Sequence, residues 1–315
     1  MIRLLAVILL FPLCALAQPY PSKPVRIIVP FAPGGGSDFI ARFMAHRLSA
    51  SLGQQFVVEN RAGAGGMIGV DLGVRSAPDG YTLTLISNSY TVNPSLYKIK
   101  FDPVDDITAV VQISQGPYLV VVNPSLPVQN MGELIALARA KPEVINFASS
   151  GTGSLVHLAT EMLAAMAGFK LNHVPYKGTG PALTDTISGQ THALFGSTAA
   201  TLPHVRSGRL RALAVTTPQR LAVEPNIPTV AEAGVPGYEV VLWHGLIAPK
   251  GMPAQAVERI NAEVNKILQL KETPETLQND GVSPAGGTSQ QFLVAIRKEI
   301  GVWRKVVQDA GVKTE

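Results

Sequence analysis

Two glycine-rich stretches hold the residues whose types and spacing could do chemistry. The first, VPFAPGGGSD (29–38), places Gly34, Gly35, Gly36 and Ser37 between an apolar run and a helical pattern. A helix leaves about four backbone N–H groups unpaired at its N-terminus and carries roughly half a positive charge there. An anion can therefore bind without any basic side chain, and glycine lets it approach the backbone closely. The stretch predicts an anion site made of main-chain amides.

The second stretch, SSGTGS (149–154), lies in the other half of the chain and also precedes a helical pattern. It offers the same amides from Ser150, Gly151, Gly153 and Ser154, with hydroxyl groups added. A tight turn alone would explain one such loop. Two loops, one in each half, favour a binding role.

The absence of a lysine in both loops points to a carboxylate rather than a phosphate, because phosphate loops of the G-x-x-x-x-G-K-[ST] type add that residue. The dinucleotide fingerprint G-x-G-x-x-G also fails, since Phe39 and Ile68 stand where its third glycine would be. We expect no cofactor.

Asp38 has two open roles. It can cap the helix that follows the first loop, where a carboxylate pairs with free N–H groups. It can instead accept a hydrogen bond from an ammonium or hydroxyl group of a ligand.

Enzymatic alternatives have weaker patterns. SLYK (95–98) matches the S-x-x-K of penicillin-recognising enzymes but lacks the companion S-D-N, and Ser154 lacks a G-x-S-x-G elbow. A serine hydrolase using Ser154 or Ser95 remains the alternative function. The histidines are dispersed without H-E-x-x-H, so we assign no metal. The segment Trp243-His244-Gly245 either borders a cleft or packs in a hinge.

The elements that position these loops alternate between strand and helix. Residues 25–31 and 54–60 read as buried strands around a helix that ends at Gly53. The second half repeats this order over 144–168, and the chain is mostly helical from 251. The strand–loop–helix–strand unit over 25–60 is typical of a parallel α/β sheet, and the repeated order predicts two similar α/β lobes, each with a bare loop at a helix N-terminus.

The first residues form a separate unit. The stretch MIRLLAVILLFPLCALAQ has the charged start, apolar run and small-x-small site of a secretory signal, so we expect cleavage after Ala17 and export. The only cysteine, Cys14, leaves with residues 1–17. Net charge is +4 over 315 residues, and the scattered basic side chains argue against a nucleic-acid partner.

An ordered set of segments resembles the Bug-type periplasmic solute-binding receptors of tripartite tricarboxylate transporters. The segments run over nearly the whole mature chain and are YPSKPVRIIVPFAPGGGSD, VVENRAGAGGMIG, PDGYTL, HVPYKGTGPALTD, LRALAVTTPQR and IPTVAEAGVPGYE. The resemblance implies a Venus-flytrap fold with a ligand cleft between the lobes. It implies lobe 1 at 18–117 plus 246–315 and lobe 2 at 118–245, with crossings near 115–122 and 240–247.

The same resemblance implies a small carboxylate as ligand, a monomer, and delivery to a membrane permease or a sensor. It places the second loop opposite the first, with Ser87, Asn88, Thr179 and Gly180 along the sides. One stretch departs from the family pattern, because His192, Gly196 and Ser197 stand where many relatives carry an Asp or Asn pair. This departure argues against aspartate or glutamate as ligand and favours a bulkier or more apolar carboxylate.

Overall fold

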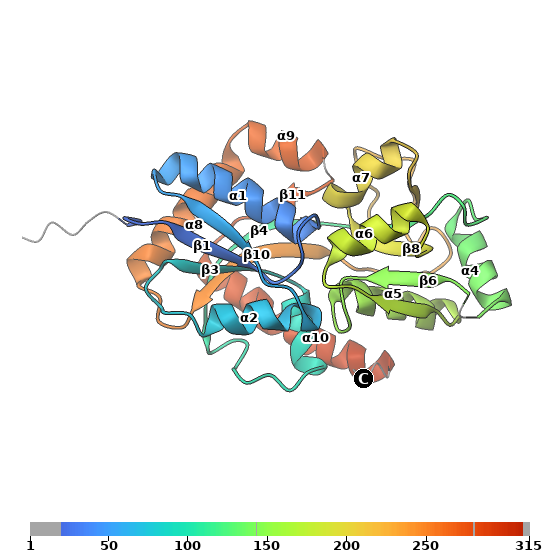
Figure 1. The fold of residues 1–315 in the computed structure, drawn as a ribbon, viewed down its shortest axis with the longest axis horizontal. Helices are drawn as coiled ribbons and strands as arrows, with labels where there is room; N and C mark the ends of the chain where they lie inside the picture. Colours follow the sequence, from blue (N-terminus) through green and yellow to red (C-terminus); the bar gives the residue numbers. More distant parts are fainter. Residues whose placement is uncertain (1–19, 143, 280, 311–315) are drawn as a thin grey trace, which may run out of the picture.

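The strands form two separate sheets, each flanked by helices (Figure 1). The structure is a computed structural model that describes residues 20–142, 144–279 and 281–310. Both sheets combine strands and helices in alternation, as the sequence predicts. The predicted secretory signal at 1–17 lies outside the described residues. Among the described helices, none joins the length and apolarity that crossing a bilayer requires.

The first sheet has six strands in the order β11-β4-β10-β3-β1-β2. Their bounds are β1 Val25–Val29, β2 Phe56–Asn60, β3 Thr82–Ser87, β4 Ile107–Gly116, β10 Leu242–Pro249 and β11 Ser283–Pro284. The strands β2, β1 and β3 run parallel, whereas β10 is antiparallel to both β3 and β4. The predicted parallel pairing of the first two strands is confirmed, and β10 makes the sheet a mixed one.

The second sheet has five strands in the order β7-β6-β8-β5-β9. Their bounds are β5 Tyr118–Val122, β6 Asn146–Ser149, β7 Asn172–Pro175, β8 Ala193–Ser197 and β9 Arg211–Val215. Here β7, β6 and β8 are parallel, and β5 is antiparallel to β8 and β9. In both sheets the antiparallel members adjoin the crossings, because a strand arriving from the other sheet enters from the opposite end.

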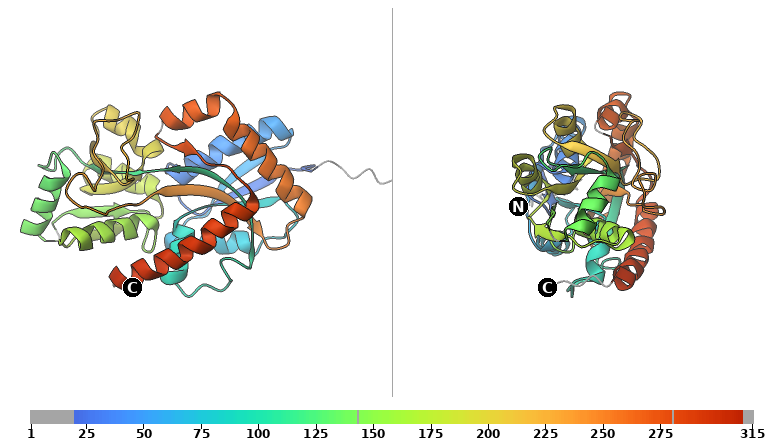
Figure 2. Two further views of the ribbon diagram at one scale, coloured as in Figure 1. Left: turned by 180° about the vertical axis from the view of Figure 1, so that it is seen from behind. Right: turned by 90° about the vertical axis from the view of Figure 1, so that its right-hand side faces the viewer.

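The helices lie on both faces of these sheets (Figures 1 and 2). Around the first sheet they are α1 Gly36–Leu52, α2 Met67–Val74, α3 Ser89–Val92, α8 Ala254–Gln269, α9 Glu272–Asn279 and α10 Ser289–Ala310. Around the second they are α4 Met131–Ala140, α5 Leu155–Ala167, α6 Thr179–Ser188 and α7 Thr198–Arg206. Short 3-10 turns η1 Ala64–Gly66 and η2 Asn93–Ser95 join them.

Local signals set several helix ends, among them the predicted end of α1 at Gly53. Gly53 ends α1 with φ of 70° and donates its N–H to the carbonyl of Ser49. Asn130 begins α4, where its side chain accepts the N–H of Glu133 at 2.9 Å. Both devices satisfy backbone groups that a helix end leaves unpaired.

The chain crosses between the sheets twice. Only Pro117 separates β4 from β5, and the return runs from the end of β9 to the start of β10. The last helix also spans both halves, since Phe292, Ile296 and Ile300 pack on the first sheet while Trp303 packs with the core of the second. Figure 2 shows α10 passing diagonally beneath both sheets.

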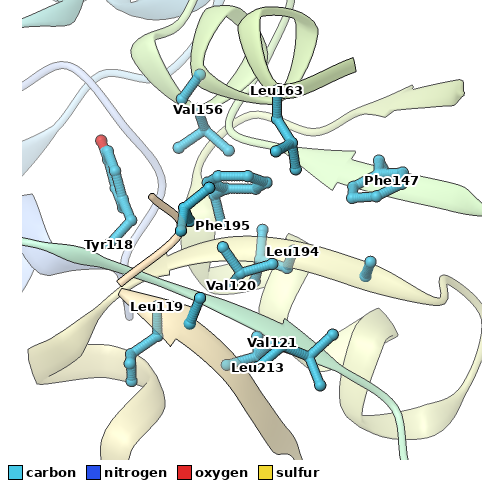
Figure 3. Packing of buried hydrophobic residues seen from close by; sticks show 14 of the residues in the cluster. Tyr118, Leu119, Val120, Val121, Phe147, Val156, Leu163, Leu194, Phe195 and Leu213 are labelled. Atoms are coloured by element: carbon cyan, nitrogen blue, oxygen red, sulfur yellow. The ribbon is translucent and has the colours of Figure 1, made fainter. Parts of the chain in front are cut away.

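The core of the second half surrounds Phe195 of β8. This ring is fully buried, and Figure 3 shows it between side chains of α5, such as Val156 and Leu163, and those of β5, such as Val120. The first sheet is covered on its two faces by two further apolar clusters. Each half therefore has its own core.

We expect Phe195→Ala to lower the free energy of unfolding by about 3–5 kcal/mol, because it leaves a cavity that a packed core fills only partly. Urea denaturation followed by circular dichroism measures the change. Val294→Ala on α10 is the control, since Val294 is 55% exposed and its truncation should cost less than about 0.5 kcal/mol. Equal effects of the two variants would contradict the placement of Phe195.

Candidate functional site

A cavity lies between the two sheets and takes its walls from both halves of the chain. The cavity is small, with a volume of about 20 Å³, which is enough for about one water molecule. Its lining residues are Phe31, Ala32, Gly35, Gly36, Ser37, Asp38, Ser87, Ser89, Tyr118, Ser150, Thr179, Ser197, Leu242 and His244. The halves are thus closed over a small, partly polar space.

Besides the four-residue α3, which starts at Ser89, three longer helices begin at this cavity. The first turn of α1 starts at Gly36, that of α6 at Thr179, and that of α7 directly after Ser197. None of the three starts has a side-chain cap hydrogen bond. Their first amides have no acceptor within the helix, and three positive dipole ends meet in one place.

The cavity lining has no lysine or arginine. The positive potential therefore comes from peptide dipoles, with hydroxyl groups of Ser37, Ser150 and Thr179 nearby. Ser197 adds a buried hydroxyl whose oxygen has no hydrogen-bond partner among the described residues. An unpaired buried hydroxyl costs free energy unless something binds it. This combination suits a small anion.

Asp38 holds the first loop in shape. Its carboxylate accepts hydrogen bonds from the Gly34 N–H at 3.1 Å, the Arg42 Nε at 3.0 Å and the Asn60 Nδ2 at 3.0 Å. Burial would raise the pKa of Asp38, but these bonds outweigh it and the pKa lies below its usual 3.8. Asp38 is therefore not the cap of α1, whose N-cap residue is Gly35, and its oxygens are engaged with the protein rather than left free for a ligand.

The second glycine loop does not keep its amides free. The N–H of Gly151 donates to Ser149 Oγ at 3.1 Å, and that of Gly153 to His157 Nδ1 at 3.2 Å. The N–H of Ser154 donates to the Gly151 carbonyl at 3.0 Å. The expected amide cradle is therefore wrong for this loop, because neighbouring side chains use its donors. Of its predicted residues, only Ser150 lines the cavity.

The remaining predicted residues divide into two groups. Gly35, Gly36, Ser37, Asp38, Ser87, Thr179 and Ser197 line the cavity together with Ser150. Gly34 and Gly180 lie just outside and face each other, since a Cβ on Gly34 would be 3.6 Å from the Cα of Gly180.

Three further residues that the sequence analysis linked to ligand binding or specificity, Asn88, Gly196 and His192, have structural roles instead. Asn88 is buried in a hydrogen-bond network. Its Nδ2 donates to Glu299 Oε1 at 2.6 Å, and its Oδ1 accepts the backbone N–H of Trp243 at 2.8 Å. A Cβ on Gly196 would meet Thr201 rather than the cavity. His192 Nδ1 accepts the Asn146 N–H at 2.9 Å. Neither Gly196 nor His192 lines the cavity, so their positions do not support the predicted preference for a bulkier or more apolar carboxylate.

Several residues of the cavity wall were not predicted from the sequence. Phe31, Ala32, Ser89, Tyr118 and Leu242 line the cavity without any motif that marks them. His244 was recognised only as bordering either a cleft or a hinge, and the structure places it in the cavity wall. The other wall residues are identified only by the way the two sheets pack against each other in the structure.

The two candidate nucleophiles lack a general base. Ser154 is fully buried and its Oγ accepts the backbone N–H of His157 at 3.3 Å, as the cap of α5. The hydroxyl oxygen of Ser95 has no hydrogen-bond partner within the described part of the chain. Neither geometry supports serine hydrolysis. Over that same part, no three His, Cys, Asp or Glu side chains group as a metal site would require.

Direct contacts between the halves keep the cavity closed. The Ala32 N–H donates to the Lys177 carbonyl at 2.9 Å, and the Tyr97 hydroxyl donates to the Thr152 carbonyl at 2.5 Å. A Cβ on Gly36 would lie 2.5 Å from Ser197 Oγ. The approach of the first loop to β8 thus depends on glycine at 36.

Comparison with known proteins places these features among solute-binding receptors. The sequence profile of the family described as "Tripartite tricarboxylate transporter family receptor" matches residues 40–312. The Protein BugT of Bordetella pertussis is 40% identical, and the match covers 99% of each chain.

Two solved structures agree with the fold. The periplasmic binding protein BugD superposes with a TM-score of 0.91 at 32% identity, covering 94% of this chain and all of the other. An R. palustris protein with adipate has a TM-score of 0.90 at 36% identity, covering 93% and 99%. These matches confirm the predicted two-lobe α/β fold class.

We expect Asp38→Asn to lower the free energy of unfolding by about 1–3 kcal/mol near pH 7, because it removes charge-assisted bonds to Gly34 and Arg42. The depressed pKa fixes the sign: the stabilisation is present above the usual 3.8 and is lost as the pH falls through the lower folded value. Urea unfolding from pH 7 to pH 2.5 should show the gap between wild type and variant narrowing below about pH 4. A gap that is absent or independent of pH would refute this role.

Proposed function

The chain belongs to the tripartite tricarboxylate transporter receptor family, and we propose that it captures a small carboxylate between its two lobes for delivery to a membrane permease or a sensor. Receptors of this family are periplasmic solute-binding proteins. In the proposed complex, the solute's carboxylate lies at the starts of α1, α6 and α7. Export through the signal at 1–17, with cleavage after Ala17, is part of the same proposal.

One observation carries the proposal. Three uncapped helix starts and the unpartnered hydroxyl of Ser197 face a cavity whose lining lacks lysine and arginine. A carboxylate would satisfy these donors, and its charge would be stabilised by the dipole ends. We assign ligand contact to Gly35, Gly36, Ser37, Thr179 and Ser197.

The sides and the far end of the site would fix the ligand's size. Ser87 and Ser150 offer hydroxyl groups, while Phe31, Tyr118 and Leu242 offer apolar surface. This mixture suits a carboxylate with a short apolar body. The structural neighbour with adipate, a dicarboxylate with such a body, makes adipate a reasonable first probe.

Ligand entry requires the halves to separate, because the closed cavity admits little more than water. We propose that residues 18–117 with 246–315 move as one lobe and 118–245 as the other. The crossings between β4 and β5 and before β10 would act as the hinge. A ligand that contacts both lobes favours the closed form, so binding and closure are coupled.

We expect a thermal-shift screen to find carboxylates that stabilise the protein. A ligand at 100 times its Kd adds about 2.7 kcal/mol to the free energy of unfolding, which raises Tm by several degrees. Succinate, adipate and benzoate are the probes, and adipamide, an uncharged analogue of adipate, is the control. Stabilisation by adipamide equal to that by adipate would exclude anion recognition. Turnover of an ester probe, followed by NMR, would favour the hydrolase alternative.

A double-mutant cycle tests closure at the first loop. Gly36→Ala should weaken binding of the best ligand by about 1–3 kcal/mol, since the new Cβ would meet Ser197 Oγ at 2.5 Å and Ser197 Cβ at 2.7 Å. In a Ser197→Gly background both of those atoms are gone, so the same change should cost far less. Isothermal titration calorimetry of the four proteins gives the coupling. Additive effects would mean that the two residues do not meet in the bound state.

A further inference from the structure

His244 is the one side chain in the cavity wall that can gain a positive charge. The other titratable groups of the lining are Asp38 and Tyr118, and neither becomes a cation. An anion in this cavity is otherwise faced only by dipoles and hydroxyl groups. The charge state of His244 therefore decides whether the site ever holds a full positive charge.

The imidazole lies beside the first turn of α1. His244 sits on β10, paired with Ser87 of β3 on one side and Ser114 of β4 on the other. A Cβ on Gly36 would be 3.8 Å from its Cε1. The ring is therefore next to the helix start where the proposed carboxylate lies. It is only 3% exposed, so a charge on it is poorly screened by solvent.

Among the described residues, no carboxylate lies close enough to the His244 ring to stabilise its protonated form. The strands β3 and β4 carry no titratable side chain. On α1, Asp38 is engaged with Arg42, and on α2, Asp71 is paired with Arg75. On α8, which packs in the same apolar cluster as Leu246 of β10, the buried Glu263 lies 3.6 Å from Lys266 Nζ. On α10, Glu299 accepts from Trp243 Nε1, and Trp243 points to the opposite side of the strand from its neighbour His244.

At the start of α7, Ser197 and Thr198 are uncharged, and the nearest titratable residue of that helix, His204, lies in its last turn. Burial lowers the pKa of His244 to about 3, so the ring is neutral without a ligand. An anion nearby acts in the opposite direction, because it stabilises the protonated ring.

Ser114 can serve both charge states. Its Oγ lies 3.3 Å from His244 Nδ1 and is itself fully buried. A hydroxyl group donates to an unprotonated ring nitrogen and accepts from a protonated one. Protonation therefore costs no hydrogen bond at this end of the ring.

We propose that His244 takes up one proton when a dicarboxylate enters the cavity, so that the receptor binds the dianion together with a proton. This inference rests on the proposed function. The proton comes from solvent and adds to a ring nitrogen, and no other bond is made or broken. The helix starts offset part of the ligand's charge, and the imidazolium offsets a further unit.

The linkage has a defined direction. Proton uptake on binding makes affinity rise as the pH falls, by up to about tenfold per pH unit between the bound and free titrations of the ring. The ligand's own titration affects wild type and variants alike. The informative quantity is therefore the difference between wild type and a variant that cannot be protonated at this position.

The experiment is calorimetric titration with adipate from pH 5 to pH 7.5, in pairs of buffers with different ionisation enthalpies. Wild type should take up as much as one proton more than His244→Gln, and its affinity advantage should grow as the pH falls. His46→Gln, on the outer surface of α1, should behave as wild type. NMR titration of the His244 ring in the wild-type complex gives a reading that does not depend on any variant.

The outcomes are separable. Equal proton uptake by wild type and His244→Gln, or a neutral His244 ring in the complex at pH 5.5, overturns the inference and leaves the proposed function intact. If no dicarboxylate binds wild type at any pH but benzoate does, the inference falls and the proposed function stands; if none of the three carboxylates binds, both fall. If His244→Gln does not fold, the ring titration in wild type alone supports or overturns the inference.

Discussion

The organisation of the molecule depends on helix N-termini that have no cap. A side chain can satisfy the first amides of a helix, as that of Asn130 does for α4 and that of Ser154 for α5. The helices α1, α6 and α7 do not, and all three begin at the same cavity. Unpaired donors in a confined space cost free energy unless water or an anion pairs with them. In this protein the unpaired donors lie where the two halves meet, and a solute bound there can pair with them and offset the lost free energy.

Glycine makes this convergence possible by removing side chains rather than by adding a contact. Gly36 lets the start of α1 approach Ser197, and Gly35 lets it approach Thr179, where a Cβ would be 3.1 Å from the threonine Cβ. Neither position has the positive φ that other residues avoid, so space is the requirement there. At Gly34, with φ of 84°, the requirement is conformational. One run of three glycines thus meets two different physical demands.

The sequence predicted what is locally encoded. The first loop, the C-terminal end of α1 and the two-lobe α/β class followed from glycine positions and the alternation of strand and helix. The second loop was misjudged because its donors are used by His157 four residues on and Ser149 two residues back, and the next amide, of Leu155, by Ser89, which is 66 residues away. Asn88 likewise bonds to Glu299 across 211 residues. The pairings of Leu155 and Asn88 arise only when the two sheets are in place.

The same geometry explains why binding and closure would be one event in the proposed function. The α1 start belongs to one sheet and the starts of α6 and α7 to the other, so neither half holds the whole site. Like-signed dipole ends repel when they are brought together, which opposes closure of an empty cleft. A carboxylate between them reverses the sign of the interaction, because each positive end then faces a negative charge. Selection would follow from this reversal: a neutral solute of the same shape would leave the repulsion in place, whereas an anion would add to the contacts that hold the two halves together.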